Sequence, residues 1–246
     1  MPSAKVQKQY LQTRITKAIY HLQLFCKKES VEQLHQLRVE IKKIKSLLRF
    51  SNDCNANKLK KQLKLLQEIF TLAGKIRSAH IYLGLTNTPT GRKFRLKQSA
   101  NKKIEWQKFS ANCDLYILHL LKVQSIAMER IQHIAGNKAD RWYKQQIKKT
   151  TKLLINEEGL HDARKRIKRI LHISDLHNPT PALNKTYLKK LENYIGKWHD
   201  IIETTGELQQ QQALSSKLKI ALTEKQKNLE NLIRKQSIDF EVRVKK

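Results

Sequence analysis

The chain has 246 residues, which allows one large domain or two smaller ones with a real hydrophobic core. It carries 50 Lys and Arg against 21 Asp and Glu, a formal net charge of +29, so a compact fold works against strong self-repulsion unless a partner neutralises the charge. Nucleic acid, an anionic membrane surface and a soluble polyanion are the candidate partners. A surface made basic for solubility alone is disfavoured, because mixed signs serve solubility without this imbalance.

The sequence lacks paired cysteines and long apolar segments, and their absence bears on the cellular compartment and on cofactor use. Cys26, Cys54 and Cys113 are widely spaced without a CxxC pair, which disfavours a disulfide framework or a thiolate metal site and indicates a reducing compartment. The opening stretch MPSAKVQKQYLQTRITKAIY lacks the apolar core of a signal peptide, and no segment approaches ~18 uninterrupted apolar residues. We therefore expect a cytoplasmic protein with no membrane partner and no cofactor.

In the first half, helical periodicity predicts helices over about 4–27, 30–51 and 56–83. Ser30 with Gln33 resembles a capping box at the start of the second helix. The loop GLTNTPTG at 84–91 precedes a helical region to about 135, with a candidate break near Asn112. Gly136-Asn137 is expected to cap that region and to divide the chain into helical halves 1–136 and 137–246.

In the second half, the pattern predicts helices over about 139–155, from about 160 to 176, and over about 182–204 and 206–238. The breaks are expected at 156–159, at HNPTP (177–181) and at Thr204-Thr205-Gly206. With few Gly and Pro and no strand alternation, the sequence predicts an all-α protein of about eight long antiparallel helices in two sets of four. Trp106, Trp142 and Trp198 are expected in the core.

The strongest feature of the sequence is an internal repeat. LHQLRVEIKKIKSLLRF at 34–50 resembles LHDARKRIKRILHISDL at 160–176, at an offset of 126. The chemical matches are His35 with His161, Arg38 with Arg164, Lys42 with Lys168 and Lys43 with Arg169. The apolar frame repeats with them, so chance is a poor explanation.

On a helix, the residues His35, Arg38, Lys42, Lys45 and Arg49 share an arc of about 80°. The apolar residues that begin at Leu34 share a second arc, centred only about 100° from the first. An ordinary amphipathic helix places its charges opposite the core, whereas this basic stripe borders it. Because cations crowded beside neighbouring helices repel one another, the stripe predicts an anion site. The alternative is a solvated Lys/Arg face with a locally packed His.

A second repeated element follows each stripe. LAGKIRSAHIYL at 72–83 resembles YIGKWHDIIETT at 194–205, and Gly74 pairs with Gly196 at an offset of 122. A Gly inside a helix costs about 1 kcal/mol relative to Ala, so close approach of two helices is the expected reason for it, rather than ligand contact. Lys75, Arg77, Lys197 and His199 come next and are expected to face the same site.

These two elements are the features by which the chain resembles the CHAD family, the conserved-histidine alpha-helical domains. The family pattern is a His, an Arg three residues on, and basic residues seven, eight and ten on, which the first copy matches from His35 to Lys45. In the second copy His161, Arg164, Lys168 and Asp175 match, but Leu171-His172 stands where Arg-Tyr is usual. Arg77-Ser78 and His199-Asp200 stand where the family has an Arg-Asp pair.

The resemblance implies a single domain of two four-helix bundles, related by a pseudo-twofold axis, with a basic central cavity or pore. It implies a stand-alone, non-catalytic protein that binds inorganic polyphosphate, or phosphate or sulfate in its place, in association with polyphosphate granules. The implied ligand contacts combine both stripes with further basic residues: His35, Arg38, Lys42, Lys43, Lys45, Arg49, Arg77, Lys148, Lys149, His161, Arg164, Lys168, Arg169 and His172.

Three other functions compete with this hypothesis. Nucleic-acid binding fits the charge, but zinc-finger, RRM and KH signatures are missing and aromatic residues do not interleave with the stripes. Phosphotransfer or metal catalysis at His35 and His161 is disfavoured, since the neighbouring Arg and Lys repel a metal ion, and no metal site is expected. A scaffold without a ligand is the third alternative. Polyphosphate chain length and oligomeric state stay open.

Overall fold

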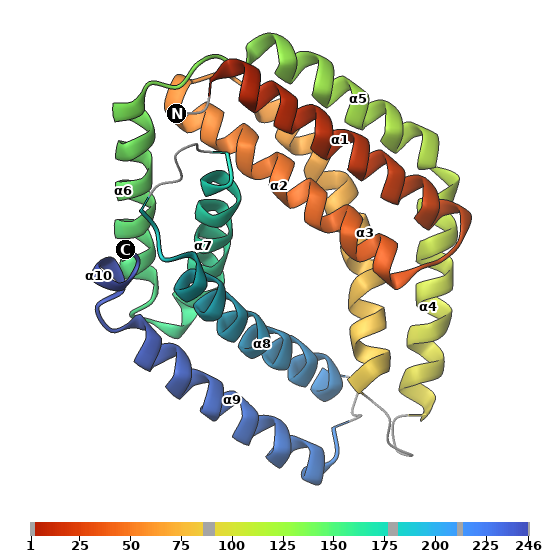
Figure 1. Cartoon of the computed structure of the whole chain (residues 1–246). Coiled ribbons are helices and arrows are strands. Elements are labelled where there is room, and N and C mark those ends of the chain that lie inside the picture. The colour runs from red at the N-terminus through yellow and green to blue at the C-terminus, as the bar shows by residue number, and fades with distance from the viewer. Residues whose placement is uncertain (1–2, 86–91, 177–181, 211–213, 246) are drawn as a thin grey trace. The chain divides into compact units, whose positions relative to one another are not determined.

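The computed structural model describes residues 3–85, 92–176, 182–210 and 214–245, without the side chains of 81–85, 92–95 and 97–98 (Figure 1). The described residues are almost entirely helical, and an isolated antiparallel bridge between Leu183 and Lys245 is the only extended pairing among them. The predicted all-α class is confirmed. The chain divides into two compact units, residues 1–135 and residues 136–246.

The first unit is built on the packing of its two opening helices. Helix α1 packs against α2 and α5, and α3 packs against α2, α4 and α5. Leu11 and Leu22 of α1 and Leu37 and Ile41 of α2 have no exposed surface, so these two helices carry much of the core. The described helices are α1 (Ala4–Lys27), α2 (Val31–Asn55), α3 (Lys60–Leu85), α4 (Arg92–Ala111) and α5 (Cys113–Arg130).

The second unit has α7 at its centre, packed against both α6 and α8, while α9 packs against α8 and α10 against α6. Ile167 and Ile170 of α7 and Leu188 and Leu191 of α8 are fully buried between these elements. Its elements are α6 (Gly136–Leu153), the short 3-10 helix η2 (Glu157–Gly159), α7 (Leu160–Ser174), α8 (Lys185–Gln210), α9 (Ser216–Ser237) and α10 (Phe240–Arg243).

Local sequence explains several helix ends. The side chains of Ser3, Ser30 and Ser215 accept the backbone N–H three residues on, at 3.2, 3.4 and 3.3 Å, and so cap α1, α2 and α9. The predicted cap at Ser30 is confirmed, but Gln33 Oε1 lies 2.7 Å from His21 Nδ1 and so does not complete the capping box. Helix α2 ends where Ala56 takes a left-handed conformation, φ 53°.

Two expected boundaries and the helix count differ from the structure. The candidate break near Asn112 is confirmed, so the described part of the first unit has five helices rather than four. Gly136 begins α6 instead of capping a helix, because α5 already ends at Arg130 and the connection buries Ile131 and Ile134. The expected break at Thr204-Thr205-Gly206 is wrong, since α8 continues to Gln210 and thereby buries Thr204 and Leu208.

Other expectations are met or lie outside the described residues. Trp142 and Trp198 are buried, and the half-buried Trp106 donates from Nε1 to the Phe25 carbonyl at 3.1 Å. Residues 86–91 of the predicted loop and the HNPTP break at 177–181 lie outside the described residues. Among the described helices none is long and apolar enough to cross a membrane.

Candidate anion-binding site

The basic stripe of α2 lies at the border of the core, as its angular position predicts. Every member of the apolar arc is fully buried: Leu34, Leu37, Ile41, Ile44 and Leu48. Beside them the stripe residues Arg38, Lys42, Lys45 and Arg49 are half-buried, and His35 at the start of the helix is exposed. Helix α7 repeats the arrangement, because Ala163, Ile167 and Ile170 are buried while His161, Arg164 and Lys168 are half-buried.

We define the first cluster as Arg38, Lys42 and Lys45 of α2 with Phe70 of α3. The Arg38 guanidinium carbon lies 4.0 Å from the centre of the Phe70 ring, and the ammonium nitrogens of Lys45 and Lys42 lie 4.8 and 5.5 Å from it. Arg38 Nη1 also donates to the Phe70 carbonyl at 2.6 Å, and Lys45 donates to Gln67 Oε1. Each cation–π contact stabilises by about 0.5–2 kcal/mol, and the neutral ring itself carries no charge that would repel an anion bound beside the three cations.

We define the second cluster as Arg164 and Lys168 of α7 with Glu192 of α8. Both cations contact the same oxygen of Glu192, Arg164 Nε at 2.7 Å and Lys168 Nζ at 2.9 Å. Burial alone would raise the pKa of the Glu192 carboxyl, but Lys168 and Arg164 outweigh it and hold the pKa below its ordinary value. Glu192 is therefore ionised at neutral pH.

The two repeated glycines make room for the two arginines. A Cβ atom built on Gly74 would lie 2.8 Å from Arg38 Nη1, and one on Gly196 would lie 2.5 Å from Arg164 Nη2. The close approach that the glycines were expected to permit is therefore made by an arginine side chain and the neighbouring helix. Each glycine serves both packing and the site, because it fixes where the guanidinium group can lie.

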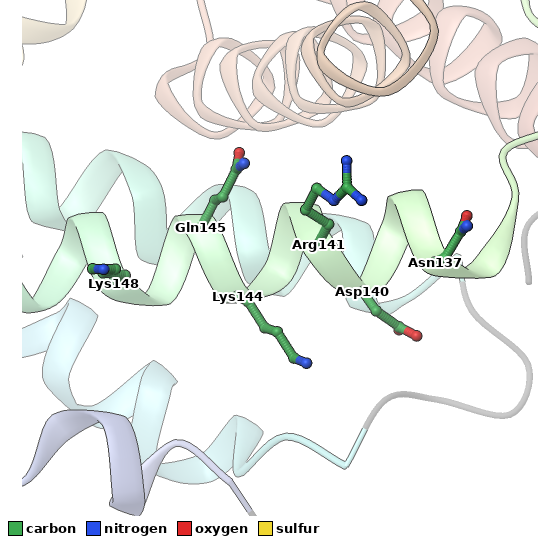
Figure 2. A pocket seen from close by; sticks show the side chains of 6 residues that line it. All are labelled: Asn137, Asp140, Arg141, Lys144, Gln145 and Lys148. Carbon is green, nitrogen blue, oxygen red and sulfur yellow. The ribbon is translucent and has the colours of Figure 1, made fainter.

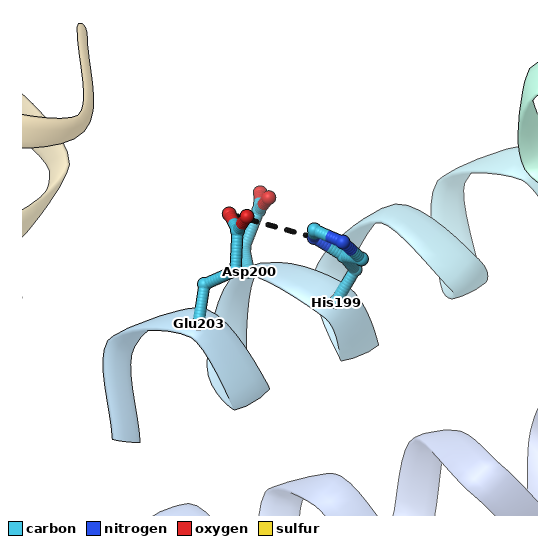
Figure 3. Close-up of side chains that lie close together, drawn as sticks. All are labelled: His199, Asp200 and Glu203. Carbon is cyan, nitrogen blue, oxygen red and sulfur yellow. Dashed lines mark ion pairs between the residues drawn. The ribbon is translucent and has the colours of Figure 1, made fainter. Parts of the chain in front are cut away.

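The histidines are placed differently in the two copies. His161 stacks on His199 of α8, with ring centroids 4.1 Å apart, and His199 Nδ1 lies 3.5 Å from Glu203 Oε2 (Figure 3). Burial lowers the pKa of His161, and the neighbouring His199, Lys165 and Arg164 lower it further. His161 is therefore neutral at pH 7 in the unliganded protein.

Sequence analysis did not consider the group formed by His199, Asp200 and Glu203, which offers three possible metal-ligand atoms within 4.8 Å of one another (Figure 3). All three come from about one turn of α8, and His199 Nδ1 lies 3.5 Å from Glu203 Oε2, so this carboxylate already contacts the imidazole.

Some predicted ligand residues lie away from the clusters. Lys43 pairs with the buried Glu40 at 2.7 Å, and Glu40 also accepts from Arg14 of α1 at 3.4 Å, so Lys43 neutralises a buried acid instead of joining the stripe. Arg77 of α3 and Arg169 and His172 of α7 are half-buried on the helices that form the clusters.

Lys148 and Lys149 are exposed on α6, outside both clusters. Lys148 lines a pocket of about 440 Å³ whose described lining comes entirely from α6, as Figure 2 shows. The lining residues are Asn137, Asp140, Arg141, Lys144, Gln145 and Lys148. Arg141, Lys144 and Lys148 recur at helical spacing, so this face presents a row of cations, with Asp140 beside them.

Sequence reasoning missed Phe70 and Glu192, the two residues against which the arginines pack. A signal was available, because each lies four residues before a repeated glycine and therefore on the same face of its helix. The two positions correspond at the offset of 122 that relates the glycines.

Comparison with known proteins identifies the family of the chain and supports its all-α fold. The family model for the CHAD domain matches residues 9–219. A crystal structure of the CHAD domain from the plant Ricinus communis is similar, with a TM-score of 0.70 and 15% identity over 99% of this chain and 93% of that one. PptA from Streptomyces chartreusis is similar with a TM-score of 0.65 and 12% identity, over 98% of each chain. No curated protein matches the chain significantly.

Proposed function

Because the chain belongs to the CHAD family, whose model spans most of it, we propose that it binds inorganic polyphosphate without chemically altering it. One observation supports the proposal most strongly: in both clusters an arginine packs against a glycine of the neighbouring helix. Two lysines lie beside it on the same helix face in the first cluster and one in the second. Family membership is the basis for proposing this ligand class, and the two clusters supply the residues that would hold it.

The chemistry of the clusters suits a polyanion without bases. Polyphosphate offers a line of negatively charged oxygens and nothing to read by hydrogen-bond pattern, so its binder needs cations in fixed positions. Arg38 and Arg164 provide guanidinium groups oriented by neighbouring helices, and Lys42, Lys45 and Lys168 provide point charges. A shared basic cavity that joins both clusters stays a prediction, as does the cytoplasmic, granule-associated location.

Salt dependence provides the test. Each phosphate neutralised by a lysine or arginine releases condensed counterions, so the logarithm of affinity should fall linearly with the logarithm of salt concentration. We expect the double substitution Arg38→Gln/Arg164→Gln to weaken binding of a defined-length polyphosphate by about tenfold or more and to flatten that slope by about one to two. A salt slope identical to that of the unsubstituted protein would exclude the clusters as the site.

Nucleic-acid binding remains the second candidate, favoured by the exposed cation row on α6. Competition separates the two ligands: we expect RNA or DNA at equal phosphate concentration to leave polyphosphate bound. Displacement by nucleic acid would overturn the polyphosphate proposal.

Absence of catalysis is part of the proposal. The Glu192 carboxylate is held by Arg164 and Lys168 and so is poorly placed to bind the Mg²⁺ that phosphoryl transfer requires. Polyphosphate incubated with the protein and Mg²⁺ should keep its chain length on a gel, and shortening over time would contradict this part.

A further inference from the structure

The two clusters differ in the residue that lies beneath the arginine. In the first it is Phe70, whose ring lies 4.0 Å from the Arg38 guanidinium carbon. At the corresponding position of the second it is Glu192, whose carboxylate accepts from Arg164 at 2.7 Å. A neutral ring and an ionised carboxylate have opposite consequences for an incoming anion, although Arg38 and Lys42 of the first cluster correspond to Arg164 and Lys168 of the second.

Glu192 occupies the position that a bound anion would take. One of its oxygens lies within 3 Å of both Arg164 Nε and Lys168 Nζ, so it already satisfies the two cations together. A carboxylate oxygen and a phosphate oxygen are the same kind of acceptor for guanidinium and ammonium donors. The side chains of Arg164, Lys168 and Glu192 are 23%, 26% and 18% exposed, so an anion can reach the pair but must compete for it.

We propose that Glu192 is a built-in competitor for the anion, which makes the second cluster the weaker of two unequal polyphosphate sites. This inference rests on the proposed function and adds to it a specificity-determining residue. Polyphosphate engages the first cluster first, and it engages the second only by displacing Glu192 from Arg164 and Lys168. The repeat therefore supplies an Arg–Lys pair twice, and Glu192 weakens the second cluster in addition to the loss of the lysine that Leu171 replaces.

The main test removes the competing charge. We expect Glu192→Gln to bind a defined-length polyphosphate about fivefold to twentyfold more tightly at moderate salt, because the two cations no longer have an ionised partner. The matched control is Glu224→Gln, which removes the same charge from an exposed position on α9 and should change affinity by less than about twofold. Equal affinities of the two variants would refute the proposal.

A cycle of substitutions locates the effect. Arg164→Gln should weaken binding only slightly in the unsubstituted protein but severalfold in the Glu192→Gln background, and Arg38→Gln should be the more damaging single change. Equal losses from Arg38→Gln and Arg164→Gln would contradict the inequality of the sites.

A reciprocal variant protects the test against a folding defect in Glu192→Gln. Phe70→Glu places a carboxylate beneath Arg38 and should weaken polyphosphate binding about fivefold or more, whereas Phe70→Leu, which only removes the ring, should weaken it less. Equal binding by Phe70→Glu and Phe70→Leu would also refute the proposal. If the unsubstituted protein binds no polyphosphate even at low salt, the proposed function fails. If it binds but these variants do not differ from their controls, only the competitor role of Glu192 fails.

Discussion

Substituting Gly74 by Ala separates the stability of the fold from ligand binding. Alanine in the interior of α3 should stabilise the helix by about 1 kcal/mol relative to glycine. Against this, the added Cβ would lie 2.8 Å from Arg38 Nη1, so the guanidinium must move by about 0.7 Å to reach an ordinary contact of about 3.5 Å. That movement strains the 2.6 Å hydrogen bond to the Phe70 carbonyl, a charge-assisted bond whose loss costs about 1.5–3 kcal/mol and whose lengthening costs a part of that.

The two effects nearly cancel for folding but not for binding. We expect the free energy of unfolding of Gly74→Ala, measured by urea titration, to stay within about 1 kcal/mol of the parent. Polyphosphate affinity at constant salt should fall about fivefold to tenfold, equivalent to about 1–1.4 kcal/mol, because Arg38 no longer lies where the glycine placed it.

Gly206→Ala is the matched control, since a Cβ at Gly206 in α8 would have no heavy atom within 4 Å. This control should gain up to about 1 kcal/mol in stability and bind polyphosphate normally. If Gly74→Ala binds as tightly as Gly206→Ala, the glycine does not position the arginine and the geometric argument for the first cluster is refuted.

Three further predictions concern protonation, thiol chemistry and packing. The pKa of His161 is lowered by burial and by neighbouring cations, so a bound polyanion should draw a proton onto it. Polyphosphate affinity should then rise about twofold to threefold as the pH falls from about 7.5 to 5.5, and His161→Gln should reduce this dependence. Without ligand, a fall in pH has the opposite effect, because it lowers the stability of the fold. The lowered pKa of His161 contributes stability that is fully present above the ordinary histidine pKa of about 6.5 and is lost as the pH falls below it. Thermal unfolding of the unsubstituted protein and of His161→Gln at both pH values would detect this loss. Burial, helped by a hydrogen bond with Cys113, raises the pKa of the Cys26 thiol. Alkylation of Cys26, measured by mass spectrometry, should therefore be much slower in the native than in the unfolded chain. Equal rates would contradict the burial of Cys26. Ile41→Ala should cost about 2–5 kcal/mol in urea unfolding because Ile41 is fully buried, whereas Ile155→Ala, at a side chain that is 76% exposed, should stay within about 0.5 kcal/mol; similar costs at both sites would contradict the assigned core.

The sequence was sufficient to predict the position of the stripe because helical geometry fixes angles within one element. Leu37 and Ile41 are buried and Arg38 and Lys42 lie at their border, as 100° per residue requires. Lys43 entered the predicted site through motif matching, although its angle places it away from Arg38, and the structure pairs it with Glu40.

What lies across from a stripe is a tertiary property that periodicity does not contain. Phe70 and Glu192 share a helix face with the repeated glycines in sequence, but their contacts with Arg38 and Arg164 depend on how α3 packs against α2 and α8 against α7. Local propensity also failed at Gly206, because burying Leu208 outweighs the cost of glycine inside a helix. The glycines at Gly74 and Gly196 were correctly expected to permit close approach, but the approaching groups are arginine side chains.

The packing of each arginine against a glycine affects the dynamics of the neighbouring backbone. The guanidinium groups of Arg38 and Arg164 cover the backbone of α3 and α8 at Gly74 and Gly196, where the helix has no side chain of its own. A ligand that draws an arginine outward uncovers that backbone, whereas one that binds the arginine in place covers it more firmly. Hydrogen exchange of the amides around Gly74 and Gly196 should therefore respond to ligand binding, and the direction of the response would show whether the arginines move when the anion arrives.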